Sequence, residues 1–421
     1  MQNKINANKS ILTYWKRDAI AGSITGMMAI PLSIGICMMS EFPIQTGLIT
    51  VVTACLIGFV TYLFKPGNHV GVPGVAAGLA PALAFGVHTF GMENMPFIIF
   101  TTSIIQALVW QFNWQKYILK LVPNYLVEGL LAGIGLKIAL KFLPFTYLTF
   151  SDHQHASFIL DSDHEIVMAL SLVSFIGFVW LYKRFQKTSP GLPYIIIIAF
   201  GIVCTLVLKL PMLEIPSAPF LLQLPIPKFS MFTPMLCLQM LGFCLMLATI
   251  DVIEQVMSNA AIEKLDPLER KCNTNNSLLA IWMANLAASF FGGMTNLDGL
   301  AKSSTNAVAG AVTKLSNLFT AAVICIVIFF PVLLSYLPEY SLGVIMIFSG
   351  WKMIAGLSHV IHLGKYQFVL AVFCGVLVFK LGIFEGLLLA ILLHFIISFF
   401  SLRNQEITLS EIWKVFKKKI A

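Results

Sequence analysis

Long apolar runs separated by short polar spacers make up most of this 421-residue chain. A transmembrane helix needs roughly 17–25 predominantly apolar residues, and by that measure the pattern predicts fourteen membrane segments. They lie near 18–39, 45–64, 71–90, 95–114, 124–145, 165–184, 191–211, 232–258, 274–291, 297–312, 315–336, 340–358, 366–380 and 381–401. The third, tenth and thirteenth are weak or short. The pattern therefore predicts an all-α polytopic membrane protein.

Two of these segments are interrupted by glycine and polar residues. The stretch 291–313 contains glycines, the acid Asp298, the base Lys302 and several hydroxyl and amide side chains. A less polar interruption, KPGNHVGVPGVAAGLAPA, occupies 65–82. Backbone groups freed from a helix inside a membrane need protein partners or a water-filled cavity. Such a segment usually binds something polar near the membrane midplane, so the two interruptions indicate a transporter.

The two interruptions occupy corresponding places in the halves of the chain. The first lies in segment 3 and the second in segment 10, which is the third of a second set of seven. Because seven is odd, the second set must be inverted in the membrane, and paired interruptions of this kind indicate a midplane binding site. Each half-helix N-terminus carries about +0.5 of an elementary charge, which favours an anion. The sequence thus predicts a 7+7 inverted repeat with half-helices in segments 3 and 10.

Composition and charge support the same class. Hydrophobic residues make up 58% of the chain, charged residues 11%, and the mean hydropathy is +0.87, whereas soluble domains carry about 25% charged residues. The net charge of +8 comes from Lys and Arg in alternate predicted loops, as expected for cytoplasmic loops. We therefore expect no nucleic-acid partner, a cell (inner) membrane location and both termini in the cytoplasm.

The loops on the two sides of the membrane differ in charge. The basic residues of the expected cytoplasmic loops are Lys65, Lys116, Lys120, Lys183, Arg184, Lys187, Lys264, Arg270, Lys271, Lys314 and Lys365. The expected outside loop, 147–164, has three aspartates and no Lys or Arg. No nucleotide-binding loop, catalytic triad, haem motif or CxxC pair is visible among the residues. We expect neither an enzyme nor a cofactor.

Three blocks of the sequence carry a resemblance to a known family. They are DAIAGSITGMMAIPLSIGICM at 18–38, LVEGLLAGIGLKIALKFLP at 126–144, and IEQVMSNAAIEKLDPLER at 253–270 followed by the glycine-rich stretch ending near 318. These blocks resemble the SulP (sulfate permease) family of anion transporters, which includes bacterial bicarbonate transporters. Two positions depart from the family pattern: Thr295 replaces a proline, and Asp298 stands where small or hydroxyl residues are common.

The resemblance implies an architecture of two parts. A cytoplasmic N-terminal segment at 1–17 would precede a transporter domain at 18–401, with a core at 18–114 and 232–336 and a gate at 124–211 and 340–401. A short basic cytoplasmic tail at 402–421 would follow, without the STAS domain usual in the family. Movement of the core against the gate would give alternating access, in a homodimer within the lipid bilayer.

The resemblance also implies two groups of site residues. The substrate-binding residues would be Gly74, Val75, Ala76, Asp298, Gly299, Lys302 and Ser303. The coupling-ion residues would be Glu254, Ser258 and Asp251, with Na⁺ at Glu254 as the one metal ion envisaged. Carboxylates inside a membrane are costly and are functional candidates by default, although these acids could instead mark the end of a span. Lys302 beside a helix N-terminus suits a bound anion, although a lysine there could also extend to the interface.

Asp298 leaves more than one function open. Beside an anion site it would repel the substrate unless it pairs with Lys302, binds a cation or is protonated. Nucleobase permeases share this architecture and use acids in segments 8 and 10, which Glu254 and Asp298 could imitate. The hypotheses are therefore a secondary active transporter of sulfate, bicarbonate or dicarboxylate coupled to Na⁺ or H⁺, a nucleobase permease, or a passive anion channel or scaffold.

Overall fold

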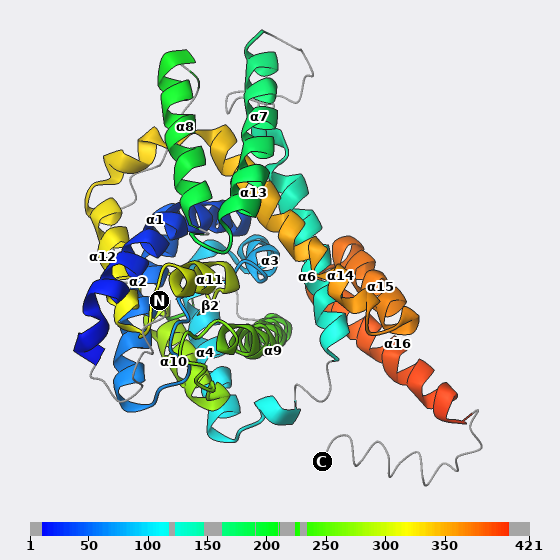
Figure 1. The fold of residues 1–421 in the computed structure, drawn as a ribbon. Helices are drawn as coiled ribbons and strands as arrows, with labels where there is room; N and C mark the ends of the chain where they lie inside the picture. The colour runs from blue at the N-terminus through cyan, green and yellow to red at the C-terminus, as the bar shows by residue number, and fades with distance from the viewer. Residues whose placement is uncertain are drawn as a thin grey trace. The chain divides into compact units, whose positions relative to one another are not determined.

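The computed structural model describes residues 11–117, 123–146, 162–189, 191–208, 210, 224–227 and 234–403. These residues are mostly helical (Figure 1). Most of the acidic loop expected at 147–164, and nearly all of the tail expected at 402–421, lie outside the described residues.

The first seven expected segments all have counterparts. They are α1 (Trp15–Ser40), α2 (Ile44–Phe64), β1 (Pro73–Val75) with α3 (Ala80–Phe90), α4 (Met95–Gln111), α6 (Asn124–Phe142), α7 (Ser162–Phe185) and α8 (Leu192–Leu208). Short 3-10 helices lie at η1 (Ile11–Tyr14), η2 (Met92–Asn94) and η3 (Pro144–Thr146).

The second seven repeat this order. They are α9 (Pro234–Glu263), α10 (Thr274–Ser289), β2 (Asn296–Asp298) with α11 (Leu300–Val308), α12 (Leu315–Phe329), α13 (Glu339–Ala355), α15 (Lys365–Leu381) and α16 (Ile383–Arg403). The 3-10 helix η5 (Pro331–Tyr336) follows α12, and the short helix α14 (Leu357–Ile361) follows α13. The predicted all-α fold, with a broken third segment in each half, is confirmed.

The two broken segments satisfy each other's backbone groups. Strand β1 pairs antiparallel with β2, with Gly74 opposite Leu297. The ladder is extended at both ends, because the Ala76 N–H donates to the Thr295 carbonyl at 3.3 Å and the Gly299 N–H donates to the Val72 carbonyl at 3.1 Å. Unpaired backbone groups are not tolerated in lipid. The pairing explains how both helices can be interrupted, and because it is antiparallel, α3 and α11 follow from opposite ends of the same strand pair.

The chain forms two compact units. The first contains the helices up to Trp110 and those from Phe142 to Met346; the second contains Gln111 to Lys141 and the chain from Ile347 onwards. Within the first, α1 packs against α12, and α2 packs against α10 and α12. Within the second, α15 packs against α16. Helices α7 and α8, which were expected in the gate, belong to the first unit; the core and gate division stays a prediction.

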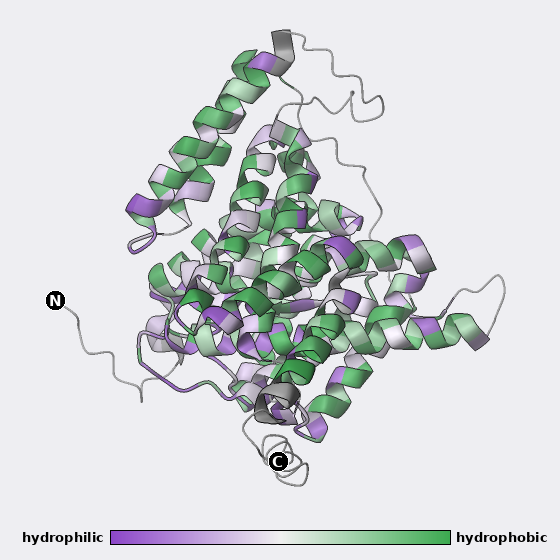
Figure 2. Ribbon diagram, turned by 90° about the vertical axis from the view of Figure 1, so that its right-hand side faces the viewer, coloured by the Kyte–Doolittle hydropathy of each residue, from purple (hydrophilic) through white to green (hydrophobic). Residues whose placement is uncertain are grey.

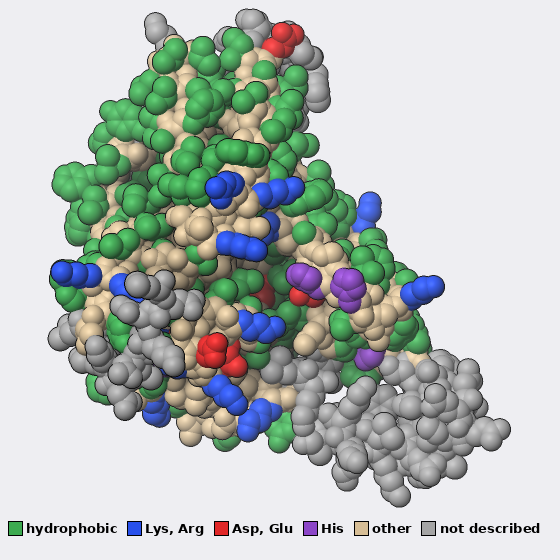
Figure 3. Space-filling model, in the orientation of Figure 1, with side chains coloured by type: hydrophobic (Ala, Val, Ile, Leu, Met, Phe, Trp, Pro, Cys, Tyr) green, Lys and Arg blue, Asp and Glu red, His purple; other side chains and the backbone are tan. Residues whose placement is uncertain are grey.

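The outer faces of the helices are apolar. On α7, Leu172, Ile176 and Trp180 expose 60%, 61% and 64% of their surface, which in water would be an aggregation hazard. Hydrophobic residues predominate along most helices in Figure 2, and hydrophobic side chains cover much of the face in Figure 3. Among the described residues, six helices are long and apolar enough to cross a membrane. These surfaces are suited to contact with lipid tails.

Candidate functional site

Lys302 lies in the first turn of α11 and is enclosed by protein. Its side chain is 2% exposed, and its amine has no hydrogen-bond partner within the described part of the chain. A Cβ atom added to Gly74 would clash with that amine, and one added to Gly299 would lie 2.8 Å from the lysine Cε. The lysine therefore lies against β1 at Gly74, as the prediction of a shared site requires. Its burial contradicts the alternative of a lysine extending to the interface.

Glu254 approaches the other half-helix. It lies on α9, is 8% exposed, and its Oε1 has no hydrogen-bond partner among the residues described. A Cβ atom added to Gly78, just before α3, would clash with this carboxylate. Helix α9 continues for nine residues beyond Glu254, to Glu263, so Glu254 does not simply mark the end of the span. A buried acid thus contacts the backbone at the start of α3.

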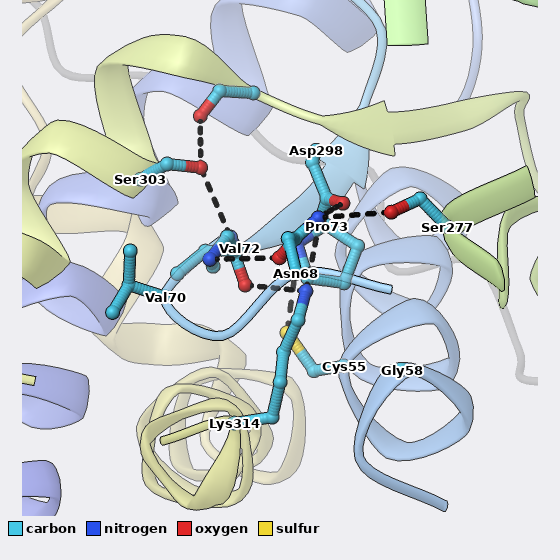
Figure 4. A network of polar contacts seen from close by, with 12 residues as sticks. Cys55, Gly58, Asn68, Val70, Val72, Pro73, Ser277, Asp298, Ser303 and Lys314 are labelled. Atoms are coloured by element: carbon cyan, nitrogen blue, oxygen red, sulfur yellow. Dashed lines mark hydrogen bonds and ion pairs between the residues drawn. The ribbon is translucent and has the colours of Figure 1, made fainter. Parts of the chain in front are cut away.

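The remaining substrate-binding candidates belong to the frame around these groups. The Ser303 hydroxyl donates to the Gly299 carbonyl at 2.8 Å and accepts from the Val72 N–H at 3.0 Å (Figure 4). Val75 lies opposite Asn296 in the strand pair, and Ala76 extends it. These residues fix α11 and β1 to one another. Their direct contact with a substrate stays a prediction.

Asp298 forms an ion pair with Lys314, a residue that the sequence analysis counted among the cytoplasmic loops. The Asp298 carboxylate accepts from the Lys314 amine at 3.1 Å and from the Asn68 amide at 2.6 Å (Figure 4). It also accepts from the Gln255 amide at 2.9 Å. Pairing with Lys302 was one of the possibilities left open for Asp298, and the structure shows other partners, because two side chains four residues apart meet only when both residues are helical. Asp298 ends the extended strand β2.

Lys314 was predicted to be a charge in a cytoplasmic loop; it lies in the connection between α11 and α12, but its side chain is buried. It is 5% exposed, and its amine donates to the Gly71 carbonyl at 2.7 Å as well as to Asp298. It is the N-cap residue of α12, with no hydrogen bond from its side chain to the helix. In the sequence it follows one predicted span and precedes the next, which is the position of a short loop. The sequence did contain a signal for this pair: Asp298 is an acid in a predicted membrane segment, where a carboxylate needs a cation, and Lys314 is a nearby base.

Asp251 is fully buried and is held by amides. Its Oδ2 accepts from Gln106 at 2.6 Å and from Asn285 at 3.0 Å, whereas its Oδ1 has no partner in the described structure. The side-chain oxygen Oδ1 of Asn285 in turn accepts from the backbone N–H of Asn296 in β2 at 2.8 Å. The sequence analysis missed Gln106 and Asn285, although amides within apolar runs are themselves a signal of buried polar contacts.

The second candidate oxygen ligand lies one turn beyond Glu254. Ser258 is half-buried on α9. Glu254 and Ser258 lie on the same helix face, since residues four apart are neighbours there. Together they could offer a carboxylate and a hydroxyl oxygen to a hard cation.

Comparison with known proteins identifies the family of this chain. The sequence model of the Sulfate permease family matches residues 15–376. The chain belongs to this family. A Bacillus subtilis (strain 168) relative named "Putative sulfate transporter YvdB" is 26% identical over 354 residues, which cover 81% of this chain and 65% of the relative. The match therefore spans about two thirds of that relative's length.

Three solved structures are also similar to this chain. The transmembrane domain of a cyanobacterium bicarbonate transporter, BicA, has a TM-score of 0.72 at 17% identity and covers 91% of this chain and 98% of that one. The SLC26A9 structure has a TM-score of 0.74 at 16% identity, covering 93% and 66%. The murine Slc26a9 anion transporter in the inward-facing state has a TM-score of 0.72 at 16% identity, covering 95% and 70%. These likenesses show the inverted-repeat fold.

Proposed function

We propose that this chain is a secondary active transporter of a small anion: sulfate, bicarbonate or a dicarboxylate. The observation that supports it best is the buried amine of Lys302, which has no protein partner among the described residues. An isolated ammonium in an apolar interior is strongly unfavourable. An anion at the start of α11 would neutralise the lysine and would also accept hydrogen bonds from free backbone N–H groups there.

Coupling to Na⁺ or H⁺ belongs to the same proposal. Glu254 is buried, has an unpartnered oxygen and contacts the start of α3. Na⁺ bound by Glu254 and Ser258 would keep the carboxylate ionised, whereas a proton would neutralise it. Asp251, one turn earlier, would be the second acid of this relay. Either cation lowers the cost of carrying a buried carboxylate through the transport cycle.

The contacts of Asp298 argue against the nucleobase permease hypothesis. That hypothesis needs an acid in segment 10 that is free to bind a neutral ring. Both carboxylate oxygens of Asp298 are instead occupied by Lys314, Asn68 and Gln255. We therefore favour the anion, and we expect the transporter to act as a homodimer in the cell (inner) membrane.

The proposal is tested by uptake into proteoliposomes. Labelled sulfate, bicarbonate and a dicarboxylate are offered with an imposed Na⁺ or proton gradient, and uracil is offered in parallel. We expect uphill accumulation of at least one anion by the wild-type protein, no accumulation by Lys302→Met, and wild-type behaviour by Lys264→Met, whose lysine is an exposed loop residue. Uracil uptake that survives Lys302→Met, or anion flux that is only downhill, would contradict the proposal.

A further inference from the structure

We propose that the ion pair between Asp298 and Lys314 determines the net charge near the bound substrate. Lys314 would thereby determine how strongly the transporter prefers dianions over monoanions. The inference rests on the proposed function, because it concerns the same site. Lys314 does not touch the substrate in this account; it acts through Asp298.

The pair is deeply buried. Asp298 is 3% and Lys314 is 5% exposed, and their charged atoms are 3.1 Å apart. Among the ion pairs of the described residues, the others have at least one partner exposed by 22% or more. Screening by water and salt is therefore weakest for this pair, and any imbalance between its two charges acts at longer range.

Asp298 is close to the proposed anion along the chain and in the fold. It precedes Gly299, the N-cap of α11, and lies four residues before Lys302. A carboxylate at a helix N-terminus competes with an external anion for the positive end of the helix. Without Lys314, the negative charge of Asp298 would offset much of the attraction that Lys302 offers.

The other neighbours of Asp298 cannot replace Lys314. Asn68 and Gln255 donate hydrogen bonds to the carboxylate, but they carry no charge. The guanidinium of Arg270, a further cation of this unit, is bonded to Asp266 and to the Val312 carbonyl. Lys314 therefore neutralises the charge of Asp298. Lys302, on α11 beside the strand pair, is left as a cation without a neutralising partner among the described residues.

The valence of the substrate makes this inference testable. The interaction of a substrate with an unbalanced charge is proportional to the charge of the substrate. Removing the charge of Lys314 should weaken binding of a monoanion by about 15-fold and of a dianion by about 250-fold, for a separation of roughly 10 Å between the Lys314 amine and the anion at an effective dielectric constant near 20. Removing the charge of Asp298 should strengthen binding, again more for the dianion.

The experiment compares Lys314→Met, Asp298→Asn and the double variant in proteoliposomes. Inhibition constants of sulfate as the dianion and formate as the monoanion are measured against uptake of whichever anion the wild type carries. We expect the ratio of the two constants to shift against sulfate in Lys314→Met, toward sulfate in Asp298→Asn, and to return to the wild-type ratio in the double variant. A merely structural role would not produce shifts of opposite sign.

Three outcomes separate the hypotheses. If the wild type carries no anion, the proposed function itself fails. If the wild type carries an anion but the ratio is unchanged in both single variants, this inference is overturned and the proposed function stands. If Lys314→Met does not fold, as judged by thermal unfolding in detergent, the expected shift in Asp298→Asn and the restored ratio in the double variant still decide the question; their absence overturns the inference.

Discussion

Two lysines, one in the second interrupted segment and one just after it, have opposite surroundings, although both are almost fully buried. Lys314 binds a carboxylate and a backbone carbonyl, whereas Lys302, at the start of α11, has no hydrogen-bond partner in the described structure. A buried ammonium with a partner contributes to a stable frame, and one without a partner needs a ligand. The difference marks Lys302 as the residue that an anion would neutralise.

The role of Glu254 in coupling is tested by Glu254→Gln. The amide is close in shape to the acid but can neither exchange a proton nor balance Na⁺. We expect anion exchange to persist while accumulation driven by Na⁺ or proton gradients falls at least tenfold. The measurement is gradient-driven uptake beside counterflow exchange, with Glu93→Gln as the control because Glu93 is exposed near a helix end. Undiminished gradient-driven uptake by Glu254→Gln would exclude it as the coupling acid.

The stability of the first unit should depend on pH through Asp266. Arg270 donates two side-chain hydrogen bonds to Asp266, each at 2.8 Å, and a third at 2.6 Å to the Val312 carbonyl. Burial alone would raise the pKa of Asp266, but the hydrogen bonds and charge of Arg270 outweigh it and hold the pKa below 3.8. The ionised pair therefore stabilises the fold above that pH, and this stability is lost as pH falls through the folded pKa.

The variant Asp266→Asn should lower the free energy of unfolding by about 2 kcal/mol at neutral pH, because a buried charged hydrogen bond is lost. Thermal unfolding in detergent should show a constant difference from the wild type down to about pH 5 and a shrinking difference below about pH 4. Glu269→Gln, at an exposed neighbour, serves as the control. A difference that does not depend on pH would refute the assignment.

At the scale of elements, the strand pair is what brings the two half-helices together. Glycine and polar residues predicted both interruptions, because a helix broken in lipid needs other partners for its backbone. The register of β1 and β2 was beyond prediction, since strands of three residues carry too little alternation to specify it. For the same reason the sequence left several partners open for the Asp298 side chain.

The close approach of Glu254 to the start of α3 gives an element-scale prediction. A methyl group at Gly78 would displace the flexible end of Glu254. We expect Gly78→Ala to reduce cation-driven uptake by about tenfold with little change in the temperature of unfolding. Gly242→Ala is the control on α9, because nothing lies within 4 Å of its added methyl group, and alanine is a better helix former than glycine. Equal uptake by the two variants would contradict the contact.

For the whole molecule, the pattern of apolar runs was sufficient to predict the order of the long helices that the structure describes in both halves. Segment length and hydropathy depend on the membrane and not on tertiary contacts, so they can be read from the chain directly. Two partners, Gln106 of Asp251 and Asn68 of Asp298, could not be predicted in this way, because they lie 145 and 230 residues away in the sequence. Lys314 lies only 16 residues from Asp298, but hydropathy alone does not pair the two charges. The family resemblance located Glu254 and Lys302, and the contacts around them required the structure.

The orientation of the chain is a prediction at the same scale. The burial of Lys314 removes one charge from the predicted cytoplasmic loops, but the exposed lysines Lys116, Lys183 and Lys264 remain there. The positive-inside rule therefore still places both termini in the cytoplasm. Fluorescent-protein fusions at each terminus should both be bright, and alkaline phosphatase fusions should both be inactive. An active phosphatase at either end would require the opposite orientation or an odd number of spans.

Equilibrium binding of labelled anion to the purified protein tests the central claim most directly. The anion is the one that the wild type accumulates, and the variants are Lys302→Met and Lys264→Met. We predict saturable binding of one anion per protomer by the wild type and by Lys264→Met, and the loss of that binding in Lys302→Met. Binding of equal affinity by Lys302→Met, in protein that unfolds at the wild-type temperature, would contradict an anion site at the start of α11.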